Sequence, residues 1–401
     1  MSKFLILGAG PAGLTFANRL MKNGERDFLV LEAESEAGGL CRSADIDGSA
    51  MDIGGGHILD VRRPEAVKFL FEFMPREEWN YFIRDSRINI NGSEISHPFE
   101  ANIWQLDIDS QVEYLSSIAK AGCVTGESMP ERFTEWVTWK LGEKIAHDYM
   151  IPYNMKVFGS ELNNLGTYWL NKLPDVSFED TLRSCLEHKA HAKQPGHAEF
   201  YYPIEHGIGE LWRRMSDALE GRVNFNQHVY AIDFDSHIVR TLEGSEYLGE
   251  IIINTIPYRE FRELNGMPEA LKHKISELKH TSVQVKYIPE NLDSQAQWIY
   301  YPDLNLSYHR IFLRHNVLKG SKGVWTETRA ERIESPHEGE YAFMNQYAYP
   351  LNTLGKNEIM NELLTWLASH NVYGLGRWGE HQHYNSDLTV ELAMKLADRF
   401  I

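Results

Sequence analysis

Three glycines near the N-terminus have the spacing of a phosphate-binding turn. Gly8, Gly10 and Gly13 follow the apolar segment 4–7, whose residue types are typical of a buried strand. The first glycine of such a turn allows the tight bend, the second lets the backbone approach a pyrophosphate, and the third lets a helix pack closely on the strand. Glu32 ends a second apolar segment, where a carboxylate can accept hydrogen bonds from a ribose diol. The pattern predicts a dinucleotide-binding βαβ unit.

A second group of glycines distinguishes between the possible cofactors. Gly38 and Gly39 come shortly after Glu32, and a glycine-rich segment, 54–57, follows them. Simple NAD-dependent dehydrogenases lack this second glycine pair. The pattern resembles that of the FAD-binding amine oxidase and mutase superfamily, in which the first pair lies near the cofactor phosphates and the later segment lies against the isoalloxazine ring. This resemblance implies FAD as the cofactor and an α/β fold with a Rossmann-like FAD-binding domain.

The C-terminal part resembles the closing flavin motif of the same superfamily. A glycine-containing turn at 373–379 precedes segment 385–387 and the helical periodicity of 388–400. The N-terminal end of such a helix carries positive partial charge and faces the flavin. The residues that the resemblance assigns to FAD are Gly8, Gly10, Pro11, Ala12, Gly13, Glu32, Ala33, Gly38, Gly39, Leu40, Gly55, Gly56, His57, Gly376, Arg377, Asn385, Ser386 and Asp387.

The composition is that of an ordinary globular protein and argues against several classes of function. The chain has 401 residues, a formal net charge of -17 and three cysteines, Cys41, Cys123 and Cys185. The negative charge argues against nucleic-acid binding, and no apolar run approaches the roughly 18 residues of a membrane span. Three scattered cysteines favour a reducing cytoplasm. No metal site is expected, and His381 and His383 are expected to contact substrate or solvent rather than zinc.

The elements that must position these motifs divide into three parts. Helical spacing of apolar residues over 111–185 predicts inserted helices, and alternation over 84–91 and 281–349 predicts strands, with a hairpin turn at Asn91-Gly92. The polar segment 189–197 is expected to be a mobile loop. The predicted parts are a discontinuous FAD-binding domain (1–80, 198–280 and 360–401), a helical insertion (100–197) and an antiparallel-sheet substrate domain (81–99 and 281–359).

Segments spread over the whole chain resemble one branch of the superfamily more closely. Pro-Tyr-Asn-Met-Lys-Val at 152–157, Tyr-Tyr-Pro-Asp at 300–303 and Gly-Arg-Trp-Gly at 376–379 are similar to motifs of the UDP-galactopyranose mutases, especially the eukaryotic type. Generic FAD oxidases share only the glycine motifs, so the first and last of these segments discriminate best. The similarity extends over almost the whole length.

This resemblance implies an activity and a site. Such mutases interconvert the pyranose and furanose forms of a UDP-sugar, with N5 of the reduced flavin attacking the anomeric carbon and displacing UDP. NAD(P)H is a candidate reductant, and homo-oligomers are known among the relatives. The residues matched to catalytic positions are His57, Asn154, Tyr300, Arg310, Tyr349 and Arg377. Those matched to substrate-binding positions are His97, Phe99, Glu100, Tyr149, Asn154, Phe158, His197, Tyr300, Arg310, Tyr349, Arg377 and His383.

Two of these residues, Arg310 and Arg377, are expected to bind the diphosphate. Guanidinium suits this role because it is planar, permanently charged and bidentate toward phosphate oxygens. The alternative for each arginine is a structural ion pair. The alternative for Tyr300 and Tyr349 is a core tyrosine, and for His57 it is a structural hydrogen bond.

Five positions around the expected nucleotide and sugar depart from the eukaryotic mutases. His97 and His383 stand where those enzymes have tyrosine, Glu100 replaces glutamine, Phe158 replaces tryptophan and His197 replaces asparagine. Buried groups without matching partners are costly, so these changes leave the hexose and the nucleotide open. Two other functions also stay open. One is an FAD oxidase or desaturase acting by hydride transfer, and the other is a flavoprotein that binds a nucleotide sugar without turnover.

Overall fold

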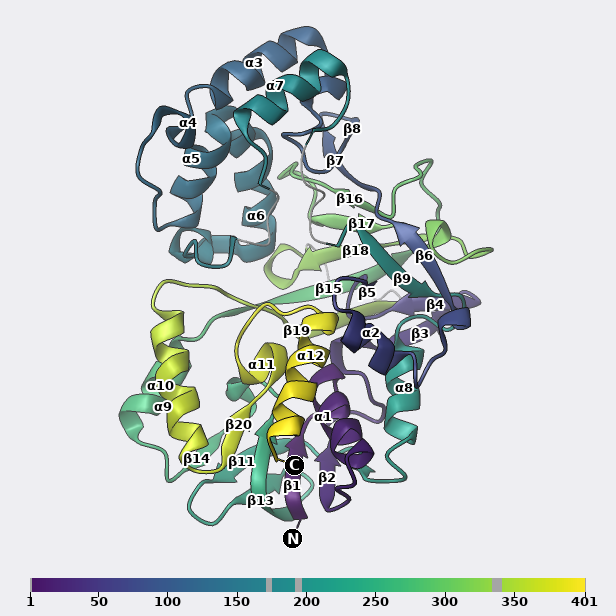
Figure 1. Ribbon diagram of the computed structural model, residues 1–401, viewed down its shortest axis with the longest axis vertical. Coiled ribbons are helices and arrows are strands. Elements are labelled where there is room, and N and C mark those ends of the chain that lie inside the picture. Colours follow the sequence, from purple (N-terminus) through teal and green to yellow (C-terminus); the bar gives the residue numbers. More distant parts are fainter. Residues whose placement is uncertain (1, 171–174, 192–196, 334–340, 401) are drawn as a thin grey trace.

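Two large sheets and a group of helices form the architecture. The computed structural model describes residues 2–170, 175–191, 197–333 and 341–400. Figure 1 shows an α/β region at the bottom, a second sheet in the middle and helices α3 to α7 at the top. No helix in these ranges is both long enough and apolar enough to span a bilayer.

The α/β region is built on an eight-stranded sheet. Its order is β10-β2-β1-β13-β12-β11-β14, with β20 also paired to β13. Pairing is parallel between β1 and its neighbours β2 and β13, and antiparallel from β13 through β12 to β11. The strands are β1 Ser2–Leu7, β2 Phe28–Leu31, β10 Val223–Asn224, β11 Val229–Asp233, β12 Ile238–Thr241, β13 Glu246–Asn254, β14 Glu263–Asn265 and β20 Val372–Gly374.

Helices cover both faces of this sheet, which explains why β1 is apolar at successive positions. Phe4 and Ile6 pack toward α1 and α12, whereas Leu5 and Leu7 pack toward α9 and α10. Successive side chains of a strand point to opposite faces, so a strand covered on both sides needs apolar residues throughout. The helices of this region are α1 Pro11–Lys22, α2 Pro64–Leu70, α8 Gly209–Asp217, α9 Glu269–Glu277, α10 Lys356–Ala368, α11 Gly376–Gly379 and α12 Ser386–Ala397.

The second sheet has seven strands in the order β19-β15-β18-β17-β16-β7-β8. Its pairing is antiparallel except between β16 and β7, which are parallel. The predicted hairpin at Asn91-Gly92 is confirmed, since both residues have positive φ (51° and 85°) between the paired strands β7 and β8. The strands are β7 Ser86–Ile90, β8 Ser93–Ser96, β15 His280–Ile288, β16 Trp298–Tyr300, β17 Arg310–Phe312, β18 Val324–Arg329 and β19 Ala342–Pro350.

Two small sheets connect these regions. β3 (Ser43–Ile46) pairs with β4 (Ser49–Asp52), and β9 (Glu199–Pro203) lies between β5 (Leu59–Asp60) and β6 (Trp79–Ile83). The predicted single strand over 84–91 is therefore wrong at its start. The chain leaves one sheet after β6 and enters another at β7, so Arg84 lies between the two strands.

Helices occupy the range where apolar periodicity predicted them. They are α3 Ile108–Ile118, α4 Gly122–Thr125, α5 Phe133–Ile145, α6 Ile151–Phe158 and α7 Phe178–Glu187, with a π-helical turn at Ala146–Met150. Phe133 and Val137 of α5 are fully buried in a core shared with β16, β17 and β18. The predicted mobile loop at 189–197 lies largely outside the described residues, and the domain boundaries stay predictions.

Candidate cofactor and substrate site

Two of the three N-terminal glycines, Gly8 and Gly13, stand where the fold has room only for glycine. Gly8 has φ +100°, and a Cβ on Gly13 would lie 2.0 Å from the Gly8 carbonyl oxygen. A Cβ on Gly10 would instead have no non-adjacent protein atom closer than 3.9 Å, the Cα of Gly39. Gly8 and Gly13 therefore shape the turn, whereas Gly10 borders open space at the N-terminus of α1.

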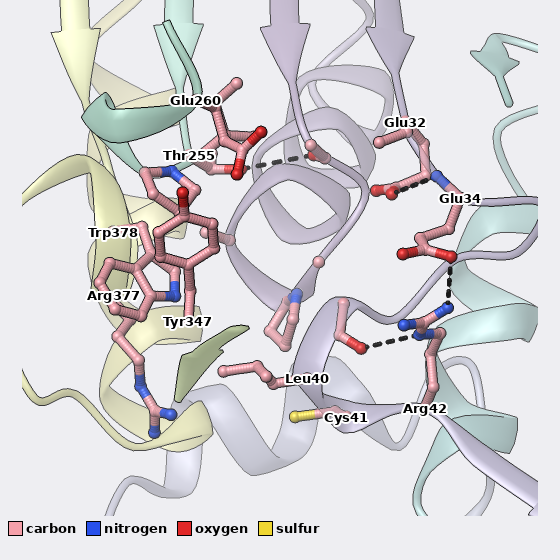
Figure 2. A pocket seen from close by; sticks show the side chains of 18 of the residues that line it. Glu32, Glu34, Leu40, Cys41, Arg42, Thr255, Glu260, Tyr347, Arg377 and Trp378 are labelled. Carbon is pink, nitrogen blue, oxygen red and sulfur yellow. Dashed lines mark hydrogen bonds and ion pairs between the residues drawn. The ribbon is translucent and has the colours of Figure 1, made fainter. Parts of the chain in front are cut away.

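That space is a cavity of about 390 Å³. Figure 2 shows Tyr347 and Trp378 on one side of it and Glu32, Glu34 and Arg42 on the opposite side. The Glu32 carboxylate accepts hydrogen bonds from the backbone N–H groups of Ala9 (2.6 Å) and Glu34 (3.0 Å). Burial raises the pKa of Glu32, and these two amides oppose the shift. A cavity lined by glycines at the helix N-terminus and by carboxylates at Glu32 and Glu34 suits a dinucleotide.

Gly10→Ala is expected to block the cofactor without unfolding the chain. The added methyl group would point into the cavity where a pyrophosphate approaches the backbone, and it meets no protein atom closer than 3.9 Å. FAD affinity should fall at least about tenfold, while the thermal midpoint of the apoprotein stays within a few degrees. Fluorescence titration with FAD measures the first quantity. Gly13→Ala is the matched contrast, because its 2.0 Å backbone clash should destabilise the apoprotein itself.

A second, central cavity of about 200 Å³ adjoins the first, and His57, Arg377 and Ser386 line both. Its glycine-rich wall is tightly packed. A Cβ on Gly54 would lie 1.9 Å from the Leu40 carbonyl oxygen, and one on Gly56 would lie 2.9 Å from the Phe312 ring. A larger residue at Gly54 would require the Leu40 backbone to move, and one at Gly56 would require the rings of Phe312 and Trp298 to shift.

His57 is a neutral imidazole in this wall. Its Nδ1 lies 2.9 Å from the Gly55 carbonyl oxygen, so Nδ1 carries the hydrogen and Nε2 is an acceptor. Burial, together with the positive charge of Arg377, lowers the pKa of His57 to about 3. The ring can therefore orient a neighbouring group by hydrogen bonding, but it does not take up a proton near neutral pH.

Arg310 is paired with a carboxylate that the sequence analysis missed. Its Nε and Nη2 lie 3.1 and 2.5 Å from the two oxygens of Glu327, and Nη2 also lies 3.3 Å from the Tyr349 hydroxyl. Glu327 is only 1% exposed. Arg310 therefore does form a structural ion pair, as the alternative interpretation expected. It also lines the central cavity and a third cavity, described below.

Arg377 has a different environment, because its guanidinium donates to backbone carbonyl oxygens. Nε and Nη2 lie 3.1 and 2.9 Å from the Tyr384 oxygen, and Nη1 lies 3.1 Å from the Ala348 oxygen. Burial lowers the pKa of Arg377 from its usual value, although a guanidinium stays charged at any ordinary pH. These bonds hold a positive charge at the junction of the cofactor cavity and the central cavity.

A third arginine, Arg84, completes the cationic lining, and no motif in the sequence marked it. Its Nη2 donates to the Tyr300 hydroxyl (2.8 Å), its Nε donates to Ser86 (2.7 Å), and its guanidinium lies 4.5 Å from the Trp298 ring centre. Burial would raise the pKa of Tyr300, but the positive charges of Arg84 and Arg310 outweigh it and lower that pKa. The change of sheet after β6 is what brings Arg84 to the cavity.

A third cavity of about 210 Å³ lies among α5, α6 and β16, and it shares Arg310 with the central cavity. Its walls are mostly aromatic. The Asn154 amide donates to the Met150 carbonyl oxygen (2.7 Å) within its own helix. The predicted substrate-binding residues in this cavity are His97, Phe99, Glu100, Tyr149, Asn154, Phe158, Tyr300 and Arg310. Those in the central cavity are His197, Arg310, Tyr349, Arg377 and His383.

The structure separates the predicted cofactor residues into two kinds. Gly13, Gly38 and Gly376 shape the chain around the cavities and do not line them. Those that line the first or the central cavity are Gly8, Gly10, Pro11, Ala12, Glu32, Ala33, Gly39, Leu40, Gly55, Gly56, His57, Arg377, Asn385, Ser386 and Asp387. The expectation for His381 is wrong, because its buried ring bonds to the Lys279 carbonyl oxygen (3.0 Å). Within the described ranges, no three His, Cys, Asp or Glu side chains gather as metal ligands.

The carboxyl group of Glu100, in the wall of the third cavity, has a shifted pKa. Burial raises the pKa of its carboxyl group to about 7. Between the pKa that the Glu100 carboxyl group has in the unfolded chain and pH 7, the folded protein binds a proton that the unfolded chain has lost. The stability contributed by this bound proton is therefore lost as the pH rises through about 7.

Glu100→Gln should remove this pH dependence. Relative to the wild type, the variant is expected to gain about 2 kcal/mol in free energy of unfolding between pH 5 and pH 8. Urea unfolding at the two pH values measures the change. The exposed Glu179, which lines a neighbouring cavity with Glu100, provides the control Glu179→Gln, for which no such gain is expected. An equal gain in both variants would contradict a buried, proton-binding Glu100.

Comparison with known proteins defines the family. The chain matches the flavin-containing amine oxidoreductase family over residues 11–288 and belongs to that family. FAD is the cofactor that the family and the first cavity support. The chain is also 36% identical over 91 residues to an uncharacterized protein of Methanothermococcus thermolithotrophicus, which corresponds to 21% of this chain and 87% of that protein.

Solved structures with the same fold have several activities. The chain is similar to a reduced UDP-galactopyranose mutase, with a TM-score of 0.89 and 22% identity over 100% of this chain and 95% of that one. It is also similar to a fatty acid isomerase from P. acnes, with a TM-score of 0.69 and 13% identity over 100% of this chain and 99% of that one. A putrescine oxidase bound to putrescine is similar as well, with a TM-score of 0.64 and 14% identity over 100% of this chain and 98% of that one. These similarities confirm the predicted α/β fold of the flavin amine oxidase and mutase type.

Proposed function

We propose that this protein is a flavin-dependent isomerase that interconverts the pyranose and furanose forms of a nucleotide sugar. The observation that carries the proposal is the position of the arginines. Arg377 lies where the cofactor cavity meets the central cavity, and Arg310 lies where the central cavity meets the aromatic one. A ligand with an anionic middle and two different ends suits such a site.

The proposed ligand is a nucleoside diphosphate sugar. Arg84, Arg310 and Arg377 would bind the diphosphate, because forked guanidinium groups match phosphate oxygens. The aromatic cavity would receive the base, with Tyr149 and Tyr153 among the rings in its wall. The sugar would occupy the central cavity beside the glycine-rich wall and His57. Such an arrangement keeps the reacting carbon away from water.

The first cavity would hold FAD through the glycine turn, Glu32 and the N-terminus of α12. FAD supplies, when bound and reduced, a nucleophilic ring nitrogen at the sugar. His57, as a neutral ring with a free acceptor, can hold one hydrogen-bond orientation there. The three arginines stabilise the negative charge that develops on a departing diphosphate.

An amine oxidase activity is disfavoured by the same charges. An ammonium substrate would enter a cavity lined by Arg84, Arg310 and Arg377, where like charges in a buried site repel strongly. The two carboxylates in the same wall, Asp60 and Asp387, are paired with Arg62 and Arg63. We therefore assign the cationic cavity to an anionic substrate.

The experiment that tests this function is turnover with purified, anaerobic holoprotein. UDP-galactofuranose is mixed with protein reduced by dithionite or by NADPH, and the products are separated by anion-exchange chromatography. We expect UDP-galactopyranose from reduced protein only, with other nucleotide furanoses as a specificity panel. Absence of isomerisation for every nucleotide sugar, with substrate bound, would make the protein a binder without turnover. Bleaching of oxidised flavin by an amine would make it an oxidase.

A further inference from the structure

One carboxyl group in the wall of the aromatic cavity is buried without a hydrogen bond from another residue. Glu100 is 8% exposed, and among the described residues only its own backbone N–H bonds to the carboxyl group. The neighbouring Phe99 ring packs edge-on against Tyr114 of α3, with 5.1 Å between the ring centres, and this contact holds the segment against the insertion helices. A buried polar group normally has a partner, because burying it without one costs free energy. A ligand in the cavity can supply that partner.

The position of Glu100 limits what the ligand can be. Glu100 and Leu141 line both the aromatic cavity and another cavity of about 260 Å³ among the insertion helices. Arg310 lines the aromatic cavity and the central cavity. The aromatic cavity therefore has a guanidinium where it meets the central cavity and a carboxyl group where it meets the helical insertion. This arrangement suits a ligand with an anionic group near one end and a hydrogen-bonding edge at the other.

The rest of the aromatic cavity is suited to a flat molecule. Trp136, Tyr149, Tyr153 and Trp169 are among the rings that line it, and the centres of the Tyr149 and Tyr153 rings lie 5.9 Å apart. Aromatic side chains bind planar ligands by stacking on them, with little dependence on which heterocycle is bound. A nucleobase is planar and carries its polar groups on its edge, so it can contact the rings and Glu100 together.

Glu100 is a carboxylic acid rather than an ion below about pH 7. Burial raises the pKa of this carboxyl group to about 7, and the positive charge of Lys140 opposes the shift. Lys140 donates to Asp175 instead (2.6 Å), so no cation forms an ion pair with Glu100 in the described part of the chain. A protonated carboxyl group donates a hydrogen bond from one oxygen and accepts one at the other.

Other titratable groups face the same two cavities. Burial and the charge of Arg84 lower the pKa of His97 to about 3, whereas burial raises the pKa values of Cys123 and Tyr149 above their usual range. These three groups therefore keep their charge near pH 7. The remaining ionisable groups in the two walls are Lys140, Tyr153, Glu179, Tyr300 and Arg310.

We infer that Glu100 recognises the base of the nucleotide as a carboxylic acid, donating one hydrogen bond and accepting another along the edge of the base. The inference rests on the proposed function, which places the base in this cavity. The matching edge has an N–H group beside an acceptor, as uracil has at N3 and O4. Ionisation of Glu100 removes its donor and sets a negative oxygen against the acceptor of the base. The nucleotide should therefore bind more weakly once Glu100 has lost its proton.

The first test is the pH dependence of binding, measured by isothermal titration of oxidised holoprotein with UDP-galactose between pH 6 and pH 9. The wild-type Kd should be constant below about pH 7 and rise up to about tenfold per pH unit above it. Glu100→Gln keeps a donor and an acceptor but cannot ionise, so its Kd should vary by less than about threefold. The control Glu179→Gln should keep the wild-type profile. Comparison of the variants removes the contribution of the other facing groups.

The second test changes the ligand instead of the protein. UDP-galactose methylated at N3 of uracil lacks the N–H group that Glu100 accepts from. At pH 6 the wild type should bind it about 30-fold more weakly than UDP-galactose. In Glu100→Leu the two ligands should bind within about threefold of each other, because neither has a partner there. Each comparison is made within one protein, so it does not depend on the stability of the variant.

The outcomes separate this inference from the proposed function. If the wild type isomerises nucleotide sugars and its Kd has the same pH profile as that of Glu100→Gln, the role of Glu100 is wrong and the function stands. Equal binding of the methylated and unmethylated ligands by the wild type would also overturn that role. If the wild type binds no nucleotide sugar at any pH, the function and the inference both fail.

Discussion

Arg310→Ala is expected to lower the free energy of unfolding by about 3–5 kcal/mol and to abolish turnover. The substitution leaves Glu327, which is 1% exposed, as a buried charge without its bidentate partner. Removing one partner of a buried ion pair destabilises a protein by more than the pair contributes to its free energy of unfolding. The remaining charge is then buried without water and without an opposite charge. Chemical unfolding followed by fluorescence measures the stability change.

A double variant separates the structural role of Arg310 from its role at the site. Arg310→Met combined with Glu327→Gln removes both charges, so the free energy of unfolding should return to within about 1–2 kcal/mol of the wild type. Turnover and UDP binding should not return, because the guanidinium that borders two cavities is gone. Recovery of activity in the double variant would show that Arg310 acts only as a structural partner of Glu327.

The second large effect is expected at Arg377, on binding rather than on folding. Arg377→Ala should weaken UDP binding by about 2–5 kcal/mol, which is a rise in Kd of roughly 30-fold or more. The partners of this guanidinium are neutral backbone carbonyl oxygens, that of Tyr384 in the wall of the first cavity and that of Ala348, so removing the side chain leaves no charged partner behind. Stability should therefore change much less than in Arg310→Ala. Isothermal titration with UDP gives the affinity.

Arg377→Lys is the matched control that separates the effect of the positive charge from the effect of the guanidinium geometry. It keeps the positive charge but loses the fork that donates to Tyr384 and Ala348, so an intermediate UDP affinity is expected. Equal affinity in the wild type, the alanine variant and the lysine variant would remove Arg377 from the diphosphate site.

What the sequence could predict was local or motif-bound. The glycine turn and the hairpin at Asn91-Gly92 depend on neighbouring residues, and the structure has both as expected. Glu32 lines the first cavity, and its role toward a ribose stays a prediction. Arg377 was found because it lies inside a recognisable turn. The helices of the insertion followed from apolar periodicity, since one face of each must pack into the shared core.

What the sequence could not predict depends on which strands meet. Glu327 reaches Arg310 because β18 pairs with β17, and Asp60 reaches His197 because β5 pairs with β9. The residue types at these four positions do not indicate which strands will pair. Arg84 was hidden by an alternating pattern that continued through a change of sheet. His381 was misplaced because the chain between α11 and α12 is not a strand: His381 has φ 47°, and its ring bonds to the Lys279 carbonyl oxygen.

The most direct test of the account is whether a nucleotide sugar becomes bonded to the reduced flavin. Dithionite-reduced holoprotein is incubated anaerobically with UDP-galactose and a panel of other nucleotide sugars, quenched with cyanoborohydride, and the released flavin is weighed by mass spectrometry. The account predicts a hexose-sized mass increase on FAD for at least one sugar, and none with oxidised protein. Flavin of unchanged mass with every sugar, together with bleaching of the oxidised protein by an amine, would contradict it and indicate an oxidase.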